Sequence, residues 1–129
     1  MKDIPKEFDI AWDEREPNAV LTTVDAYGIP NSVWVLCLHR LNKKKILVAN
    51  NSLKKTLDNI KTNSYGSLLF IAPERRAYQV KGSLEYHTDG EIFQNIRDWL
   101  DPQYPGHGVV ILTIEEIFFG AEKVYETAS

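Results

Sequence analysis

The chain has 129 residues, a formal net charge of −3, a hydrophobic fraction of 43% and a charged fraction of 26%. This length suits one domain with a real core, and the acidic balance argues against a nucleic-acid binder that works by bulk electrostatics. The single cysteine, Cys37, cannot form an internal disulfide, no Cys and His residues have metal-ligand spacing, and no apolar run is long enough to span a bilayer.

The first predicted element is an amphipathic helix near the N-terminus. Four large or apolar residues recur there on one face at helical spacing: Ile4, Phe8, Ala11 and Trp12. Apolar strands are predicted next over 19–24, 32–40 and 45–49. Residues 25–28 and 42–44 have the composition of turns, so the second and third strands form a hairpin.

A polar turn and a helix start follow the third strand. Leu53, Leu57 and Ile60 give this helix its apolar face, and Asn51 or Ser52 can serve as its N-cap. A helix start has unpaired N–H groups and partial positive charge, so Lys54 and Lys55 with the hydroxyls of Ser52 and Thr56 suit a phosphate dianion. Taken alone, a solvated helix start explains the pattern at least as well, and the glycine-rich loop of nucleotide triphosphate sites is absent.

Two longer strands are predicted over 65–72 and 77–86, joined by a turn at 73–76. Thr88 and Glu91 have capping-box spacing. The helix that follows has a wide apolar face made of Ile92, Phe93, Ile96, Trp99 and Leu100. Two prolines and two glycines make a loop of 101–108, after which strands are predicted over 109–114 and 117–124.

These elements amount to about seven strands and three helices, and the short connections favour antiparallel pairing. With so many strands in a short chain, closure into a barrel is the economical way to hide the sheet edges. We therefore predict a mainly β fold in one domain over residues 1–129: a closed, six- to seven-stranded antiparallel β-barrel with peripheral helices.

Several other polar and aromatic residues have ordinary explanations. Trp34 lies on the strand that leads to the phosphate segment, and a core role is the simplest reading of a strand tryptophan. His39, His87 and His107 have no partner carboxylate at a recognisable spacing, so we expect surface or capping roles rather than catalysis. The lysines at 43–45 fit a solvated turn that also protects a strand edge.

Three segments, taken in order, carry a family resemblance: 19–32, 46–59 and 78–85. The first is similar to an opening hairpin with Asp, Gly and Pro, the second to a phosphate segment with Lys55-Thr56, and the third to a strand with a Gly and an acidic residue. Together they resemble the FMN-binding split barrels, the pyridoxamine 5′-phosphate oxidase-like proteins, and above all the small single-domain FMN-binding proteins of anaerobic microbes. The resemblance extends over residues 8–124.

The resemblance implies a homodimer with one FMN at each of two subunit interfaces. It implies that Lys55 and Thr56 bind the phosphate with help from Ser52, and that Asn50 and Asn51 line the ribityl–phosphate end. Ser32, Val33 and Trp34 would contact the edge of the isoalloxazine ring. Asn59 and Gln79 match more weakly, and core or surface roles remain open for them. Tyr104, or else Trp99, would be the aromatic that the partner chain places over the flavin.

The sequence departs from the pyridoxamine phosphate oxidases proper, because neither their arginine-rich phosphate motif nor their C-terminal substrate segment is found here. We therefore expect a cytosolic FMN protein of another activity, which passes electrons or hydride through the flavin as an oxidoreductase such as a flavin reductase, or as an electron carrier. No catalytic side chain and no metal are predicted, and the expected partner is a second copy rather than a membrane or a nucleic acid.

The alternative is a non-enzymatic barrel that binds another ligand, either haem, a deazaflavin or single-stranded nucleic acid. For the last of these, three aromatic residues and a basic turn would supply the binding surface: Trp34, Tyr78, Tyr86 and 43–45.

Overall fold

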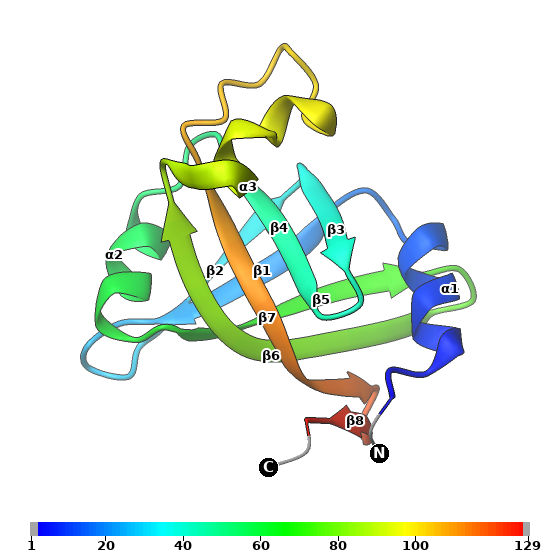
Figure 1. The fold of residues 1–129 in the computed structure, drawn as a ribbon. Helices are drawn as coiled ribbons and strands as arrows, with labels where there is room; N and C mark the ends of the chain where they lie inside the picture. The colour runs from blue at the N-terminus through cyan, green and yellow to red at the C-terminus, as the bar shows by residue number, and fades with distance from the viewer. Residues whose placement is uncertain (1–2, 128–129) are drawn as a thin grey trace.

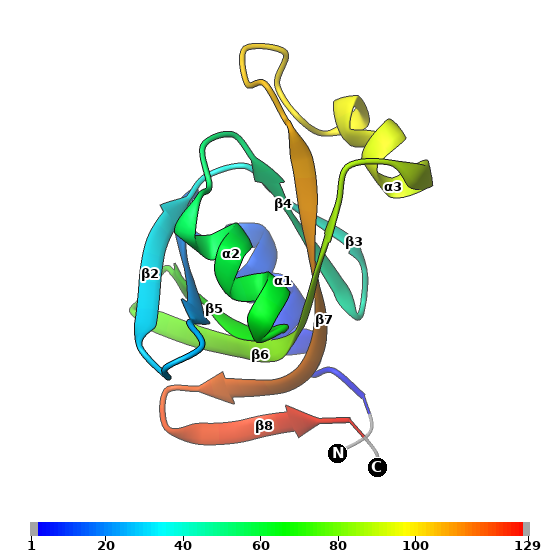
Figure 2. The ribbon, with the colours of Figure 1, turned by 90° about the vertical axis from the view of Figure 1, so that its left-hand side faces the viewer.

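The computed structural model describes residues 3–127, and within them eight strands form one sheet that curls into a half-barrel (Figures 1 and 2). The helices are α1 (Lys6–Glu14), α2 (Lys55–Thr62) and α3 (Gly90–Gln94), with a 3₁₀ turn η1 (Ile96–Asp98) after α3. The strands are β1 (Ala19–Val24), β2 (Pro30–Val35), β3 (Leu38–Asn42), β4 (Lys45–Asn50), β5 (Tyr65–Ala72), β6 (Arg76–His87), β7 (Gly108–Phe119) and β8 (Glu122–Glu126).

The order of strands is β2-β1-β5-β6-β7-β4-β3, with β8 paired to β7, and every pairing is antiparallel. The predicted mainly β, antiparallel fold is therefore confirmed. The predicted closure is not, because β2 and β3 end the order and do not pair with each other within the described residues. The count is also eight strands rather than six to seven.

The predicted single strand over 32–40 is two strands, β2 and β3. Trp34 pairs with Val20 of β1, whereas Leu38 pairs with Val48 of β4 at the other end of the sheet. The chain crosses between these partners at Leu36 and Cys37, where the Ala49 N–H donates to the Cys37 carbonyl at 3.0 Å. The local pattern does not mark this break, because the apolar run over 33–38 continues through the crossing.

Both helix starts differ from prediction. Helix α2 begins at Lys55 and its N-cap is Lys54, which makes no side-chain capping bond, so neither Asn51 nor Ser52 caps it. The N-cap of α3 is Asp89, also without a side-chain bond, so the predicted capping box does not form. The helix predicted after Thr88 is short, because one turn of α-helix gives way to η1 and then to the proline-rich loop.

The C-terminal strands also divide differently. The ranges 109–114 and 117–124 were predicted as two strands, but β7 runs unbroken through both and β8 begins only at Glu122. A register shift at Gly82 of β6 lets the long pair bend. A Cβ at Gly82 would overlap the Thr113 carbonyl, so the close approach of β6 and β7 there requires glycine.

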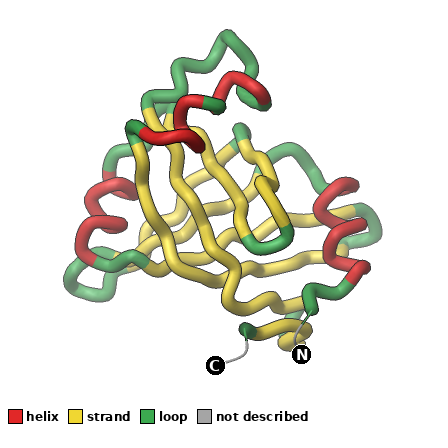
Figure 3. The backbone as a smooth tube through the Cα atoms, in the orientation of Figure 1, coloured by secondary structure: helices red, strands yellow, loops and turns green. Residues whose placement is uncertain are grey.

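Helices α1 and α2 fill the curve of the sheet, one at each end, as Figures 2 and 3 show. Phe8 of α1 packs edge-on against Phe70 and Tyr78, with ring centroids 5.6 and 5.4 Å apart. The central core continues with the buried inward-facing residues of β1, β5, β6 and β7. Burial of each large apolar side chain contributes about 1.5–3 kcal/mol, so this core carries much of the stability.

A second, smaller cluster lies on the outer face of β4 and β7, where α3 and η1 cover it. Its buried members are Leu47, Ala49, Ile96, Leu100, Val109 and Ile111. This cluster anchors the loop that follows η1 against the end of β4. None of the helices within the described residues is long and apolar enough to cross a membrane.

Candidate functional site

The end of β2, the turn from β4 into α2 and the loop after η1 meet at one side of the sheet. They enclose a hollow of about 220 Å³. Four of the predicted cofactor residues line it: Trp34, Asn51, Ser52 and Tyr104. Cys37, half-buried, lies in the same wall. These residues come from three separate segments, so only the fold brings them together.

A neighbouring hollow of about 270 Å³ lies between the β1–β2 turn and α2. Lys55 opens onto it, together with Asn59 and two carboxylates, Asp25 and Asp58. The two carboxylates disfavour a dianion in this hollow. The exposed groups at the helix start itself, Ser52, Lys54 and Lys55, therefore form the better anion site.

Thr56 does not share the exposure of Lys55. It is 1% exposed, and Asn31 Nδ2 donates to its Oγ1 at 3.4 Å. A helix turn places neighbouring residues about 100° apart, so Lys55 faces solvent while Thr56 faces the sheet. Of the predicted phosphate pair, only the Lys55 side chain reaches the surface.

Asn59 lies one turn further along and is also buried, at 7% exposure. Its Nδ2 donates to the hydroxyl of Thr23 at 3.0 Å, and Thr23 is fully buried. This bond ties α2 to β1. Of the roles left open for Asn59, the structure shows the core role.

Asn50 and Asn51 hold the turn in place. Asn50 Nδ2 donates to Tyr86 Oη at 2.8 Å, and the Leu53 N–H donates to Asn50 Oδ1 at 2.8 Å. Asn51 accepts from the Gly106 N–H at 3.1 Å and donates to Cys37 Sγ at 3.3 Å. Asn51 therefore connects the β4–α2 turn to the loop and to the β2–β3 crossing.

The three predicted residues on β2 do not share a face. Ser32 and Trp34 point outward, where Ser32 Oγ lies 2.8 Å from Thr22 Oγ1 and Trp34 is 74% exposed. Val33 faces inward and packs against the core. Gln79 of β6 lies on the outer face, but two strands separate β6 from β2, so it is remote from the hollow in its own chain.

Two aromatic residues were predicted to reach the partner's flavin. Tyr104 lines the hollow of its own chain. Arg97 holds that loop, because its guanidinium donates to the carbonyls of Asp101, Tyr104 and Pro105 at 3.2, 2.8 and 2.8 Å. Nothing in the local sequence pattern marks Arg97 as a positioning residue.

The second candidate, Trp99, stacks on His39 with ring centroids 5.3 Å apart and an interplanar angle of 11°. It lies outside the residues that line the hollow. His87 was expected to lack a carboxylate partner, but its Nε2 lies 3.1 Å from Glu85 Oε1. The two side chains meet because residues i and i+2 of a strand share a face.

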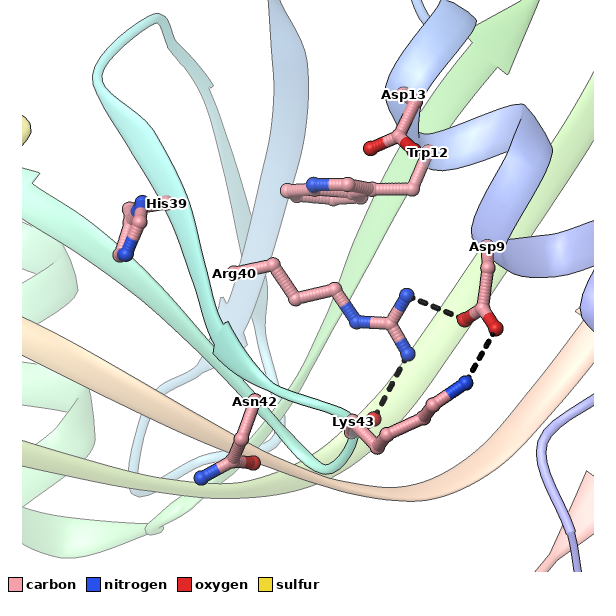
Figure 4. A pocket seen from close by; sticks show the side chains of 7 residues that line it. All are labelled: Asp9, Trp12, Asp13, His39, Arg40, Asn42 and Lys43. Atoms are coloured by element: carbon pink, nitrogen blue, oxygen red, sulfur yellow. Dashed lines mark hydrogen bonds and ion pairs between the residues drawn. The ribbon is translucent and has the colours of Figure 1, made fainter.

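A hollow of about 460 Å³ between α1 and β3 contains none of the predicted cofactor residues (Figure 4). Arg40 Nη1 and Lys43 Nζ both donate to the Asp9 carboxylate, at 2.6 and 2.7 Å. The sequence suggested that Lys43 is simply solvated, but it also binds Asp9. Burial by itself would raise the pKa of Asp9, but the hydrogen bonds from Lys43 and Arg40 outweigh it and hold that pKa below its ordinary value.

The surface proposed for single-stranded nucleic acid is not formed. Trp34 is on the outer face, whereas Tyr78 is 5% exposed and packs against Phe8 and Phe70 inside the sheet. A base cannot stack on a buried ring. Likewise, no group of three or more His, Cys, Asp or Glu side chains within residues 3–127 is placed to hold a metal ion.

Comparison with known proteins gives a family and several structural neighbours. The family model described as "Pyridoxamine 5'-phosphate oxidase" matches residues 9–120. An uncharacterized protein of Methanocaldococcus jannaschii is 31% identical over 103 residues, which cover 76% of this chain and 69% of that protein.

Among solved structures, HupZ of Group A Streptococcus is 25% identical with a TM-score of 0.78, and the match covers 98% of this chain and 99% of HupZ. An FMN-binding protein from Syntrophomonas wolfei is 19% identical with a TM-score of 0.73, over 95% of this chain and 91% of that one. The second likeness shows the fold alone.

Neighbours with other cofactors in their descriptions share this fold. HutZ, a heme storage protein from Vibrio cholerae, is 18% identical with a TM-score of 0.65 and covers 98% of both chains. A structure described as an F420 reductase is 17% identical with a TM-score of 0.69, over 89% of this chain and 98% of its own. Both likenesses show the fold alone.

Proposed function

We propose that this chain, which belongs to the pyridoxamine 5′-phosphate oxidase family, is a flavoprotein. It binds FMN non-covalently and passes electrons or hydride through it. One observation carries the proposal. The exposed start of α2 adjoins the hollow lined by Trp34, Asn51, Ser52 and Tyr104, so a cationic helix start lies beside an aromatic-walled space. A molecule with a phosphate at one end and a flat ring at the other matches both.

The donor groups at the helix start fit a phosphate. Lys55 supplies a cation, Ser52 a hydroxyl, and the first turn of α2 its N–H groups and the positive end of the helix dipole. Thr56 would contribute through its backbone, since its side chain is buried. Asn50 and Asn51 would border the ribityl chain while holding the turn.

The ring would lie along the end of β2, with Ser32, Val33 and Trp34 offering backbone groups and Trp34 and Tyr104 offering aromatic faces. The bound flavin would supply the redox chemistry, and the chain would orient it and shield it from water. We assign no cofactor role to Asn59, because its amide is committed to Thr23. Gln79 could contact a flavin only from the partner chain.

We further propose a homodimer through the outer face of β2, β1 and β5. Trp34, Leu69 and Ile71 are 74%, 44% and 43% exposed, and Val20 lies between Trp34 and Leu69 in register. We call these four residues the outer apolar face. Contiguous apolar surface of this kind is typical of an interface. A second copy packed there would also cover the open side of the Trp34 hollow.

The test is the visible spectrum of the protein purified from a flavin-rich host, followed by titration of the stripped protein with FMN. We expect a flavin absorption band and saturable binding of one FMN per chain. No flavin band together with no binding in the titration would refute the proposal.

A second candidate is that the same hollow takes haem or a deazaflavin, which the descriptions of HutZ and the F420 reductase support. The same experiment separates the two. A haem Soret band, or retention of a deazaflavin in preference to FMN, would favour this candidate over FMN.

A further inference from the structure

A separate hollow of about 390 Å³ lies between the outer face of β3 and the α3–η1 segment. Its floor is Leu47, which is 1% exposed, and one wall is the indole of Trp99. Six other residues complete the lining: His39, Leu41, Glu91, Ile92, Asn95 and Asp98. None of them lines the Trp34 hollow, so the two spaces are built from different residues.

The aromatic wall is held in place. The His39 ring stacks on Trp99 at a centroid distance of 5.3 Å, and Trp99 also packs against the cluster of Leu47, Ile96 and Leu100. These contacts join the η1 turn to strand β3, so the hollow is built by elements from both sides. Its volume lies within the range of small-molecule sites, about 300–1,000 Å³.

The charge of this hollow is negative. Glu91 and Asp98 contribute two carboxylates, and within the described residues neither forms an ion pair with a lysine or arginine. Arg97 is the nearest basic residue in the sequence, but its guanidinium donates hydrogen bonds to the loop carbonyls rather than to these carboxylates. Burial lowers the pKa of His39, so its ring is neutral near pH 7 and adds no compensating charge.

We propose that this hollow binds a small organic cation with an apolar or aromatic body. The ammonium group would lie by Glu91 and Asp98, and the body would pack on Leu41, Leu47 and Trp99. Carboxylates beside an aromatic wall favour a cation through charge attraction and, over the ring, a cation–π contact. A metal ion fits less well, since the hollow offers two carboxylates and no assembled ligand set.

The test uses three indoles of similar shape: tryptamine, which is a cation, tryptophol, which is neutral, and indole-3-acetate, which is an anion. Binding to the full chain is followed by NMR, through the shift of the Trp99 indole N–H. We expect saturable binding of tryptamine, at least tenfold weaker binding of tryptophol, and none of indole-3-acetate.

The matched variants are Glu91→Gln with Asp98→Asn, which keep the shape of the hollow and remove its charge. They should weaken tryptamine binding about tenfold and leave FMN binding unchanged. The control is Glu122→Gln, an exposed carboxylate on β8. Equal binding of tryptamine and tryptophol, no saturable shift with tryptamine, or undiminished affinity in the double variant would each overturn the proposal, whether or not FMN binds.

Discussion

At the scale of single residues, two neighbours at the start of α2, Lys55 and Thr56, differ in exposure and therefore in role. Lys55 is exposed, whereas Thr56 is buried beneath Asn31. An exposed cation can meet a ligand phosphate without first breaking a contact in the protein. A buried hydroxyl with a partner stabilises the helix position instead.

We predict that Lys55→Ala weakens FMN binding about tenfold, because it removes one charge-assisted bond to the phosphate. Fluorescence titration of FMN measures this. Lys61→Ala, at the other end of the same helix, is the control and should bind FMN as the parent does. Equal affinities in the two variants would show that the phosphate lies elsewhere.

The Asn59–Thr23 bond gives a prediction about stability. Asn59→Ala leaves the buried Thr23 hydroxyl without its partner, and the free energy of unfolding should fall by about 1–3 kcal/mol. Urea unfolding measures the change. In a double-mutant cycle with Thr23→Val, the combined loss should be smaller than the sum of the single losses. Additive losses would mean that the hydrogen bond contributes nothing.

At the scale of elements, helix α1 is braced against the β3–β4 hairpin by one carboxylate. Asp9 accepts hydrogen bonds from Arg40 and Lys43 (Figure 4). The Arg40 guanidinium also lies 5.0 Å from the centre of the Phe8 ring. These contacts join the β3–β4 hairpin, at the edge of the sheet, to helix α1, which packs inside the curve of the sheet. This contact connects segments more than thirty residues apart in the sequence.

This brace predicts a pH dependence. The pKa of Asp9 is lower in the folded protein than its ordinary value of 3.8, so the stability it contributes is fully present above that value and is lost as pH falls through the folded pKa. Asp9→Asn should therefore lower the free energy of unfolding by about 2 kcal/mol at pH 7, with a smaller difference as the pH drops below 3.8.

Urea titrations of the parent and of Asp9→Asn across that pH range test this. Asp13→Asn, on the same helix and beside the same hollow, is the matched control because Asp13 makes no ion pair in the described residues. A constant difference between parent and Asp9→Asn at all pH values would contradict the assignment.

At the scale of the whole molecule, two regions of the outer face of the curled sheet differ in whether another element covers them. The face of β4 and β7 is covered by α3 and η1, whereas the outer apolar face of β2, β1 and β5 has no covering element within the described residues. The chain itself therefore shields only the β4–β7 region from solvent. A second copy of the chain is the simplest partner to bury the outer apolar face.

We predict that Trp34→Glu raises the dissociation constant of the dimer about 30-fold or more, since a central aromatic at an interface is commonly worth about 2 kcal/mol. Light scattering coupled to gel filtration measures the mass across a dilution series. Ile10→Glu, which changes an exposed residue of α1, should leave the dimer intact. If the parent chain is itself a monomer at all concentrations, the proposed interface is wrong.

Local pattern was sufficient wherever contacts within an element dominate. The apolar stripe of Leu57 and Ile60 predicted α2, and the short apolar run over 19–24 predicted β1. The polar turn before α2 predicts an anion site, which the FMN titration tests. These features depend only on the spacing of residues that are close together in the chain.

Which of those residues face one another depends on how distant segments pack in the fold. The chain changes sheet partners at Leu36 and Cys37, since β2 pairs with β1 and β3 pairs with β4, and no local signal marks that change. The pleat then turns Val33 inward beside an outward Trp34, and the sheet above α2 buries Thr56. Burial and pairing arise where distant segments meet. The local pattern therefore predicted most of the elements and led us to expect an anionic ligand, whereas the fold sets which side chains are exposed to bind it.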